Sequence, residues 1–319
     1  MDLRDEFGRT FKTLRVSLIN TCNLGCIYCT CGKEELAENA KSTKEKGLSV
    51  EELVTIIAQL HQKLNLEVVR FTGGEPLLYR NLDQIVGAVR DLGIRSLKLT
   101  TNGLLLENQA SELKKAGITS INVSLDAIDE DVFYKVSRRS GINRILNGIE
   151  KALDSGIDVK INSVIMKNQN SDQIIPLLNF AFERNIKIRF LEIMSMGHLF
   201  GKADDFFFSQ DEILAVIKEK YKFKKLQRTH SSTANYWQTE PGGIFGIVAN
   251  ETEPFCGDCN RLRLDSMGNI YGCLSSNHPI SLKNTNSDFE LEEKLNIALK
   301  QKQTLRFTGS NLSMLNIGG

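Results

Sequence analysis

A regular alternation of strand-like and helix-like segments constrains the fold of this chain more than any other feature. From Leu14 to about Glu192, short β-branched runs alternate with amphipathic helical stretches. This alternation predicts a parallel sheet whose strands are joined by crossover helices. The expected strands are Leu14–Ile19, Val68–Phe71, Ser96–Thr100, Ser120–Ser124, Asp158–Ile165 and Lys187–Leu191.

Six such units are fewer than the eight that close a complete barrel. We therefore expect an α/β fold with an incomplete (βα)6, TIM-like barrel. A parallel sheet tolerates little exposure, so the C-terminal region has to cover the open side. The alternation of strand-like and helix-like segments ends after Met194. We therefore place the boundary between the two regions near residue 200, with 1–200 as the partial barrel and 201–319 as the C-terminal region. The polar stretch Cys31–Gly47 is expected to be a mobile loop.

The charge and composition of the chain argue against binding to nucleic acid or to membranes through bulk charge. Forty Lys and Arg residues against thirty-nine Asp and Glu residues give a net charge of +1. No bulk attraction therefore draws the chain to nucleic acid or to an anionic membrane, and a polyanionic ligand needs local cations. The sequence has no apolar leader and no apolar run of membrane-spanning length. We expect a soluble, cytoplasmic protein, and a homodimer is left open.

The seven cysteines fall into two tight groups. Their odd number, their clustering and the lack of an export signal argue against a disulfide framework. They favour metal ligation in a reducing compartment. The first group is Cys22, Cys26, Cys29 and Cys31, and the second is Cys256, Cys259 and Cys273.

The first group has the spacing C-x3-C-x2-C and follows the first expected strand, where the loops of a βα barrel build an active site. Three thiolates, from Cys22, Cys26 and Cys29, can hold three irons of a cubane cluster and leave the fourth iron open. A zinc knuckle completed by a distant residue is the alternative. Cys31 has no evident partner and is interpreted as a spare thiol. Gly74, after the second strand, allows close approach of the backbone to a ligand.

The second group has the spacing C-x2-C-x13-C, again with three thiolates and no fourth. A structural zinc site completed by His278 is a serious alternative, because three Cys and one His form a common zinc set. Arg261 and Arg263 lie two residues apart, so on a strand both project from one face beside the metal. Guanidinium pairs suit phosphate or carboxylate, although a solvated charge pair stays open.

The segment from Cys22 to Cys29, C-N-L-G-C-I-Y-C, resembles the radical S-adenosylmethionine superfamily. The resemblance implies a [4Fe-4S] cluster whose open iron binds the amino and carboxylate groups of S-adenosylmethionine. It also implies one-electron cleavage of the sulfonium to a 5'-deoxyadenosyl radical. From the residues alone, packing roles for Tyr28 and Met194 stay open. The residues implied to border the cofactor are Tyr28, Gly74, Ser124 and Met194.

Nearly the whole chain resembles the GTP 3',8-cyclase family of molybdenum cofactor biosynthesis. The likeness includes Phe7-Gly8-Arg9, Thr100-Thr101-Asn102-Gly103, Phe255 to Leu264 and the terminal Gly318-Gly319, a tail that enters the active site in that family. It implies a lyase that converts GTP to (8S)-3',8-cyclo-7,8-dihydroguanosine 5'-triphosphate. It also implies that a second [4Fe-4S] cluster, held by Cys256, Cys259 and Cys273, binds the guanine edge. The implied GTP contacts are Arg15, Arg70, Thr100, Lys160, Arg261, Leu262 and Arg263, with Arg261 and Arg263 also catalytic.

The same resemblance implies three partners: GTP as substrate, a one-electron donor protein, and a cyclic pyranopterin monophosphate synthase that takes the product. The chain departs from the family pattern at Ile19-Asn20-Thr21, commonly Thr-Asp-Arg, and at Thr30-Cys31-Gly32, where Met-Pro is usual. One alternative is a radical enzyme with an auxiliary cluster that acts on another nucleotide or a peptide. An alternative of another class is a non-catalytic regulator that binds zinc or iron.

Overall fold

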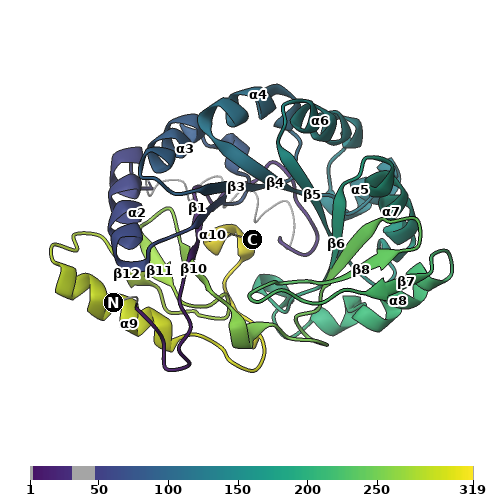
Figure 1. Cartoon of the computed structure of the whole chain (residues 1–319). Helices are drawn as coiled ribbons and strands as arrows, with labels where there is room; N and C mark the ends of the chain where they lie inside the picture. Colours follow the sequence, from purple (N-terminus) through teal and green to yellow (C-terminus); the bar gives the residue numbers. More distant parts are fainter. Residues whose placement is uncertain (1–2, 31–46, 319) are drawn as a thin grey trace.

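A single curved sheet of twelve strands organises this computed structural model, which describes residues 3–30 and 47–318 (Figure 1). Cys31 and nearly all of the expected loop Cys31–Gly47 lie outside the described residues. The strands are β1 Thr13–Ser17, β2 Val68–Thr72, β3 Ser96–Thr101, β4 Ile118–Ser124, β5 Asp158–Ile165, β6 Lys187–Glu192, β7 Phe223–Lys225, β8 Asn235–Thr239, β9 Ile244–Val248, β10 Arg261–Leu264, β11 Asn269–Tyr271 and β12 Ile280–Ser281.

The helices of the described residues lie mainly on the outside of this sheet (Figure 1). None of them is both long and apolar enough to cross a membrane. They are α2 Val50–Leu64, α3 Leu82–Asp91, α4 Leu106–Ala116, α5 Glu130–Ser137, α6 Ile142–Asp154, α7 Ile174–Glu183, α8 Gln210–Lys218, α9 Asp288–Lys300 and the short α10 Met314–Ile317.

Strands β1 to β6 are parallel and follow chain order, so each is joined to the next by a crossover that contains a helix. The six expected strands are all present, with ends that differ by at most two residues. The predicted α/β fold with an incomplete, six-unit barrel is therefore confirmed.

The C-terminal region extends the sheet at both of its edges. On one side β10 pairs in parallel with β1, placing Leu262 beside Leu14, and β11 and β12 follow in antiparallel order. On the other side β9 pairs in parallel with β6, placing Phe245 beside Ile188, and β8 and β7 follow. Six strands from the last third of the chain thus flank the open side of the barrel, and the second cysteine group lies on the β10 side.

Local signals explain where the helices begin and which face they bury. Helix α2 starts at a capping box: the Ser49 Oγ accepts from the Glu52 N–H at 3.2 Å, and the Ser49 N–H donates to Glu52 Oε2 at 2.7 Å. It ends at Asn65 in the left-handed region, with φ 51°. In α3 the four apolar residues with helical spacing, Leu82, Ile85, Val86 and Val89, are all buried. Each such side chain contributes about 1.5–3 kcal/mol on burial.

Alternation along each strand decides what faces the inside of the barrel. In β5, Val159 and Ile161 are buried in the core shared with the helices, while Lys160 and Asn162 line the interior cavity. The same parity holds in β2, where Arg70 faces inward between buried neighbours. Because successive side chains of a strand point to opposite faces, the strands pack one set of residues against the helices and turn the other set, which includes these cations, toward the cavity, where they lie among apolar residues such as Val164 and Leu191.

Candidate active site

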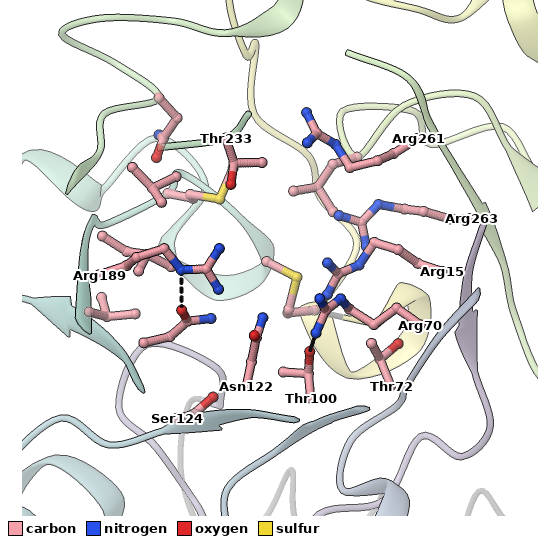
Figure 2. A pocket seen from close by; sticks show the side chains of 18 of the residues that line it. Arg15, Arg70, Thr72, Thr100, Asn122, Ser124, Arg189, Thr233, Arg261 and Arg263 are labelled. Carbon is pink, nitrogen blue, oxygen red and sulfur yellow. Dashed lines mark hydrogen bonds between the residues drawn. The ribbon is translucent and has the colours of Figure 1, made fainter. Parts of the chain in front are cut away.

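A cavity of about 770 Å³ occupies the interior of the barrel (Figure 2). Both cysteine groups open onto it, although they are more than 220 residues apart in sequence. The described cysteines form no disulfide. The lining thiols are Cys22, Cys26, Cys29, Cys256, Cys259 and Cys273.

Cations from six strands and one loop line this cavity. The strand register places Arg15 beside Arg70 on one side and beside Arg263 on the other, and it places Lys98 beside Arg70. Figure 2 shows Arg15, Arg70, Arg261 and Arg263 along one wall, with Arg189 across the cavity. The lining cations are Arg15, Arg70, Lys98, Lys160, Arg189, Arg261, Arg263 and Lys302.

Burial and neighbouring like charge lower the pKa of two arginines on this wall. Burial and the neighbouring Arg263 and Arg70 hold the pKa of Arg15 well below its usual value. Burial, then Arg189, lowers the pKa of Arg70 to about 9. The Nε of Arg15 and one Nη of Arg261 are buried without a hydrogen-bond partner. Buried donors need acceptors, so this wall is built to receive an anion with several oxygens.

Neutral polar side chains hold the guanidinium groups in place. Arg70 donates to the Leu99 carbonyl at 3.1 Å and to Thr100 Oγ1 at 3.4 Å. Arg189 donates from Nε to Asn162 Oδ1 at 2.9 Å, a contact drawn in Figure 2. With its amide oxygen turned toward the two guanidinium groups, Asn122 accepts from Arg189 at 2.8 Å and from Arg70 at 3.0 Å. These contacts orient the cations without neutralising them.

The first cysteine loop packs tightly against the glycine segment that follows β2. The Gly74 N–H donates to the Ile19 carbonyl at 2.6 Å, and a Cβ at Gly74 would lie 2.2 Å from the Thr21 carbonyl oxygen. Only glycine fits this approach. Cys22 Sγ accepts from the Leu24 N–H at 3.4 Å and from the Asn102 amide at 3.6 Å. Hydrogen bonds of this kind stabilise a thiolate that ligates a metal.

Two buried carboxylates border the first cysteine loop. Burial raises the pKa of Glu75 to about 7, although it accepts from Thr101 Oγ1 at 2.6 Å and from the Asn102 N–H at 2.7 Å. Burial likewise raises the pKa of Asp126 to about 6. Asp126 accepts from the Tyr28 hydroxyl at 2.8 Å, which fixes that ring on the cavity wall. A positively charged ligand at this end would stabilise both carboxylates in their ionised form.

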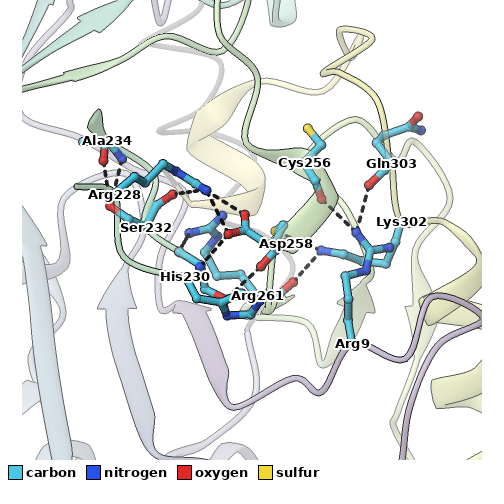
Figure 3. A network of polar contacts seen from close by, with 12 residues as sticks. Arg9, Arg228, His230, Ser232, Ala234, Cys256, Asp258, Arg261, Lys302 and Gln303 are labelled. Carbon is cyan, nitrogen blue, oxygen red and sulfur yellow. Dashed lines mark hydrogen bonds and ion pairs between the residues drawn. The ribbon is translucent and has the colours of Figure 1, made fainter. Parts of the chain in front are cut away.

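The second cysteine loop is surrounded by cations instead (Figure 3). Lys302 Nζ donates to Cys259 Sγ at 3.2 Å, and Arg9 donates to the Cys256 carbonyl at 2.8 Å. Burial alone would raise the pKa of Cys259, but Lys302 and Arg261 lower it to about 6. Thiolate is the form that binds metal, so the surroundings of Cys259 favour a ligand role.

An ion pair fastens a neighbouring loop to this second cysteine loop (Figure 3). Arg228 makes a bidentate pair with Asp258, at 2.9 Å and 2.7 Å, and the Ser231 N–H donates to Asp258 Oδ2 at 2.7 Å. Arg261 then donates to the Ser231 carbonyl at 3.2 Å. Residues 229–233 all line the cavity, so Asp258 connects the second cysteine loop to a hydroxyl-rich stretch of the wall.

The donor sets fit iron-sulfur clusters better than closed zinc sites. Each group offers three thiols beside an open cavity, which leaves room for an external ligand. His278, the candidate fourth ligand for zinc, is exposed and does not line the cavity.

The C-terminal tail lies inside the curve of the sheet, where α10 is seen in Figure 1, and Met314 and Leu315 of α10 line the cavity. Arg263 donates to the Ile317 carbonyl at 3.3 Å and also to the Gly318 carbonyl. Gly318 is buried with φ 73°, and a Cβ there would lie 2.2 Å from Thr72 Oγ1. The position therefore requires glycine. Gly319 lies outside the described residues.

Most residues singled out from the sequence meet at this cavity. Leu262 does not line it: its side chain is fully buried, and its backbone belongs to the β10 pairing with β1. The predicted residues on the wall, besides the six cysteines, are Tyr28, Gly74, Ser124, Met194, Arg15, Arg70, Thr100, Lys160, Arg261 and Arg263.

Several residues on the cavity wall or next to it were missed from the sequence. Lys98 and Arg189 sit at the inward-facing parity of β3 and β6, so strand alternation could have found them. Asn122 is found by the same rule in β4. Lys302 and Asp258 carry no comparable signal, because their contacts depend on how distant segments pack.

Comparison with known proteins supports the same conclusions. The Radical SAM superfamily model matches residues 16–181, and the Molybdenum Cofactor Synthesis C model matches residues 186–307. The GTP 3',8-cyclase of Synechocystis sp. is 38% identical over 317 residues, which cover 99% of this chain and 95% of that protein. The GTP 3',8-cyclase of Staphylococcus carnosus is 37% identical over 279 residues, 86% of this chain and 82% of that protein.

This chain belongs to the GTP 3',8-cyclase family. The predicted family is thus confirmed, and the chain is a radical S-adenosylmethionine enzyme of molybdenum cofactor synthesis. The cofactors expected from the resemblance, S-adenosylmethionine and two [4Fe-4S] clusters, are those of this family.

Solved structures support the fold of this GTP 3',8-cyclase family member. Native anSMEcpe with bound AdoMet has a TM-score of 0.66 at 15% identity, over 92% of this chain and 84% of that one. Streptococcus suis SuiB bound to S-adenosylmethionine has a TM-score of 0.61 at 16% identity, over 93% of this chain and 67% of that one. At such low identities these likenesses concern the barrel architecture alone.

Proposed function

We propose that this chain converts GTP to (8S)-3',8-cyclo-7,8-dihydroguanosine 5'-triphosphate, the first step of molybdenum cofactor biosynthesis. One observation carries the proposal: both groups of three thiols open onto one cavity whose wall holds buried arginines with unpaired donors. A nucleoside triphosphate supplies the oxygens that these donors lack. The curated relatives named GTP 3',8-cyclase cover almost the whole chain.

Residues 1–200 would supply the cofactor half of the site. Cys22, Cys26 and Cys29 would hold the first [4Fe-4S] cluster, with the fourth iron open to S-adenosylmethionine. When bound, these groups supply a 5'-deoxyadenosyl radical by one-electron cleavage of the sulfonium. The ionised carboxylates nearby would favour the positive sulfonium. The residues proposed to border the cofactor are Tyr28, Gly74, Ser124 and Met194.

Residues 201–319, together with the inner face of the barrel, would supply the substrate half. Cys256, Cys259 and Cys273 would hold the second [4Fe-4S] cluster against the guanine. Arg261 and Arg263 lie on β10 and line the same cavity as these three cysteines, so they would clamp the triphosphate and fix the ribose relative to the first site. The further GTP contacts proposed from the sequence are Arg15, Arg70, Thr100, Lys160 and the Leu262 backbone. We add Lys98, Asn122 and Arg189, because they line the same cavity.

The task of the protein is orientation. The reaction removes one hydrogen atom from C3' of the ribose and forms a bond from C3' to guanine C8. One electron and one proton complete the dihydro product. The cavity walls bury the reacting groups and exclude competing reactions with water. The strand-borne cations hold the phosphates on a rigid sheet, which keeps the ribose in one place.

Partners and location follow from the same proposal. The electrons would come from a one-electron donor protein, and the product would pass to a cyclic pyranopterin monophosphate synthase. The described cysteines form no disulfide, which suits a reducing compartment, so we place the chain in the cytoplasm.

The test is anaerobic incubation of the reconstituted chain with S-adenosylmethionine, a chemical reductant and GTP. We expect equal amounts of 5'-deoxyadenosine and cyclised nucleotide. Formation of 5'-deoxyadenosine with GTP recovered unchanged would contradict the substrate assignment. Zinc in place of iron at either cysteine group would contradict the radical mechanism itself.

A further inference from the structure

The second cysteine loop is held from two sides by basic residues that are distant in sequence (Figure 3). From the N-terminal segment, Arg9 donates to the Cys256 carbonyl at 2.8 Å and to the Gln303 carbonyl at 3.2 Å. From the segment after α9, Lys302 reaches the loop directly. These contacts tie both ends of the chain to one cysteine loop, but only Lys302 touches a sulfur atom among the described contacts of the basic residues.

Lys302 is placed by three separate contacts. Its Nζ donates to Cys259 Sγ at 3.2 Å and to the Arg261 carbonyl at 2.9 Å. The same ammonium lies 5.4 Å from the centroid of the Phe11 ring, which is fully buried. No carboxylate within the described part of the chain forms an ion pair with Lys302. Its positive charge is therefore directed at the sulfur and at the backbone that carries Arg261.

A cation in hydrogen-bond contact with a ligand sulfur acts on the redox properties of a cluster. Addition of one electron makes the cluster more negative by one charge. A nearby ammonium stabilises that reduced form more than the oxidised form, so it raises the reduction potential.

We propose that Lys302 is a positioning residue that tunes the second cluster. Through Cys259 it raises the reduction potential of that cluster, and through the Arg261 carbonyl it fixes the guanidinium that faces the substrate. This inference rests on the proposed function, since it requires a [4Fe-4S] cluster on Cys256, Cys259 and Cys273.

The same lysine couples the cluster to the substrate wall. Arg261 continues the contact chain, because its guanidinium donates to the Ser231 carbonyl at 3.2 Å. Ser231 is fastened in turn to Asp258, between the first two cysteines of the group. Loss of Lys302 therefore removes one contact to the Arg261 carbonyl, while the β10 pairing with β1 and the guanidinium contact to Ser231 remain.

The experiment compares full-length variants in which Cys22, Cys26 and Cys29 are Ala, so that only the second cluster remains. In this background Lys302→Met removes the charge and the donor, Lys302→Gln keeps a donor without charge, and Lys302→Arg keeps the charge. The matched control is Lys300→Met, an exposed lysine at the end of α9. Iron and sulfide are counted first, and the midpoint potential is then measured by anaerobic titration with electron paramagnetic resonance.

We expect full iron content in all variants. The midpoint potential should fall for Lys302→Met, fall less for Lys302→Gln, and return toward the parent value for Lys302→Arg. Lys300→Met should leave it unchanged. An unchanged potential in Lys302→Met with full iron would overturn the proposal. Loss of iron from both the Met and the Gln variants would also overturn it, by assigning Lys302 a purely structural role. If the parent itself holds no second cluster, the proposed function fails instead.

Discussion

The two cysteine groups share a three-thiol pattern but lie in different electrostatic surroundings. At the first group, burial and the Glu75 carboxylate raise the pKa of Cys22 to about 11. At the second group, burial raises the pKa of Cys256 to about 11, but Lys302 and Arg261 overcome the effect of burial at Cys259 and lower its pKa to about 6. One cavity thus has an acidic end and a basic end, each next to its own set of thiols.

The difference indicates which ligand belongs at which end. S-adenosylmethionine carries a sulfonium cation, so the end with Glu75 and Asp126 suits it. A triphosphate carries several negative charges, so the end with Arg261, Arg263 and Lys302 suits it. The net charge of +1 does not reveal the two ends of the cavity, because it is a sum over all charged residues of the chain.

The largest effect should follow from removing a thiol at the first site. Replacing Cys22, Cys26 or Cys29 by Ala should abolish reductive cleavage of S-adenosylmethionine, because the cluster needs all three thiolates to keep one iron open. The second cluster should keep its iron and its response to GTP. The measurement is 5'-deoxyadenosine formed per chain, together with an iron count. Full cleavage of S-adenosylmethionine by any of these variants would contradict the assignment of the first cluster to these three cysteines.

The next largest effect should come from the basic end. Arg261→Ala or Arg263→Ala should weaken GTP binding by about tenfold to hundredfold, equivalent to about 1.5–3 kcal/mol for one charge-assisted contact. S-adenosylmethionine cleavage should persist, so cleavage and cyclisation become uncoupled. The matched control is Arg95→Ala, because Arg95 is exposed and outside the cavity wall.

Guanosine sharpens this comparison. It lacks phosphates, so the loss caused by either arginine substitution should shrink when guanosine replaces GTP in the binding assay. Equal losses for the two ligands would mean that these arginines do not contact phosphate.

A smaller effect is expected from the C-terminal tail. Gly318→Ala places a Cβ against Thr72 and disturbs the carbonyls that Arg263 contacts. Forced packing of this kind costs about 1–3 kcal/mol, so cyclised product should fall on the order of tenfold while iron content stays unchanged. Gly201→Ala is the matched control, since Gly201 has a similar φ of 72° but no atom within 4 Å of an added Cβ. Equal effects of the two substitutions would refute a role for the tail.

The smallest effect should come from the ion pair beside the second cysteines. Asp258→Asn keeps the shape but weakens the contacts to Arg228 and Ser231. The KM for GTP should rise about threefold to tenfold, for roughly 1 kcal/mol of lost positioning, with the cluster intact. Glu112→Gln, in an exposed ion pair with Lys115, is the control. A change in iron content without a change in KM would place Asp258 in cluster retention alone.

The strands and the first cysteine loop could be predicted because their signals are local. Alternation over Asp158–Ile165 gave the strand with its observed bounds, and the helical spacing of Leu82, Ile85, Val86 and Val89 identified the buried face of α3. The spacing of Cys22, Cys26 and Cys29 likewise marks a site within one loop.

The extension of the sheet at both edges could not be predicted, because it depends on pairing between distant segments. Strand β10 lies beside β1 although about 250 residues separate Leu14 from Leu262. The sequence of neither segment indicates which strand it pairs with. The same holds for Lys302, which follows a helix and reaches Cys259 only through the packing of α9. Arg189 differs, because its inward parity was available from the sequence.

The measurement that tests the central claim most directly is electron paramagnetic resonance of two single-cluster forms of the full chain. One form carries Ala at Cys256, Cys259 and Cys273, and the other carries Ala at Cys22, Cys26 and Cys29. Both are reduced anaerobically and titrated with S-adenosylmethionine and with GTP in separate samples. The account predicts that S-adenosylmethionine changes the spectrum of the first form only and that GTP changes the spectrum of the second form only. A GTP response from the N-terminal cluster, or none from the C-terminal cluster, would contradict it.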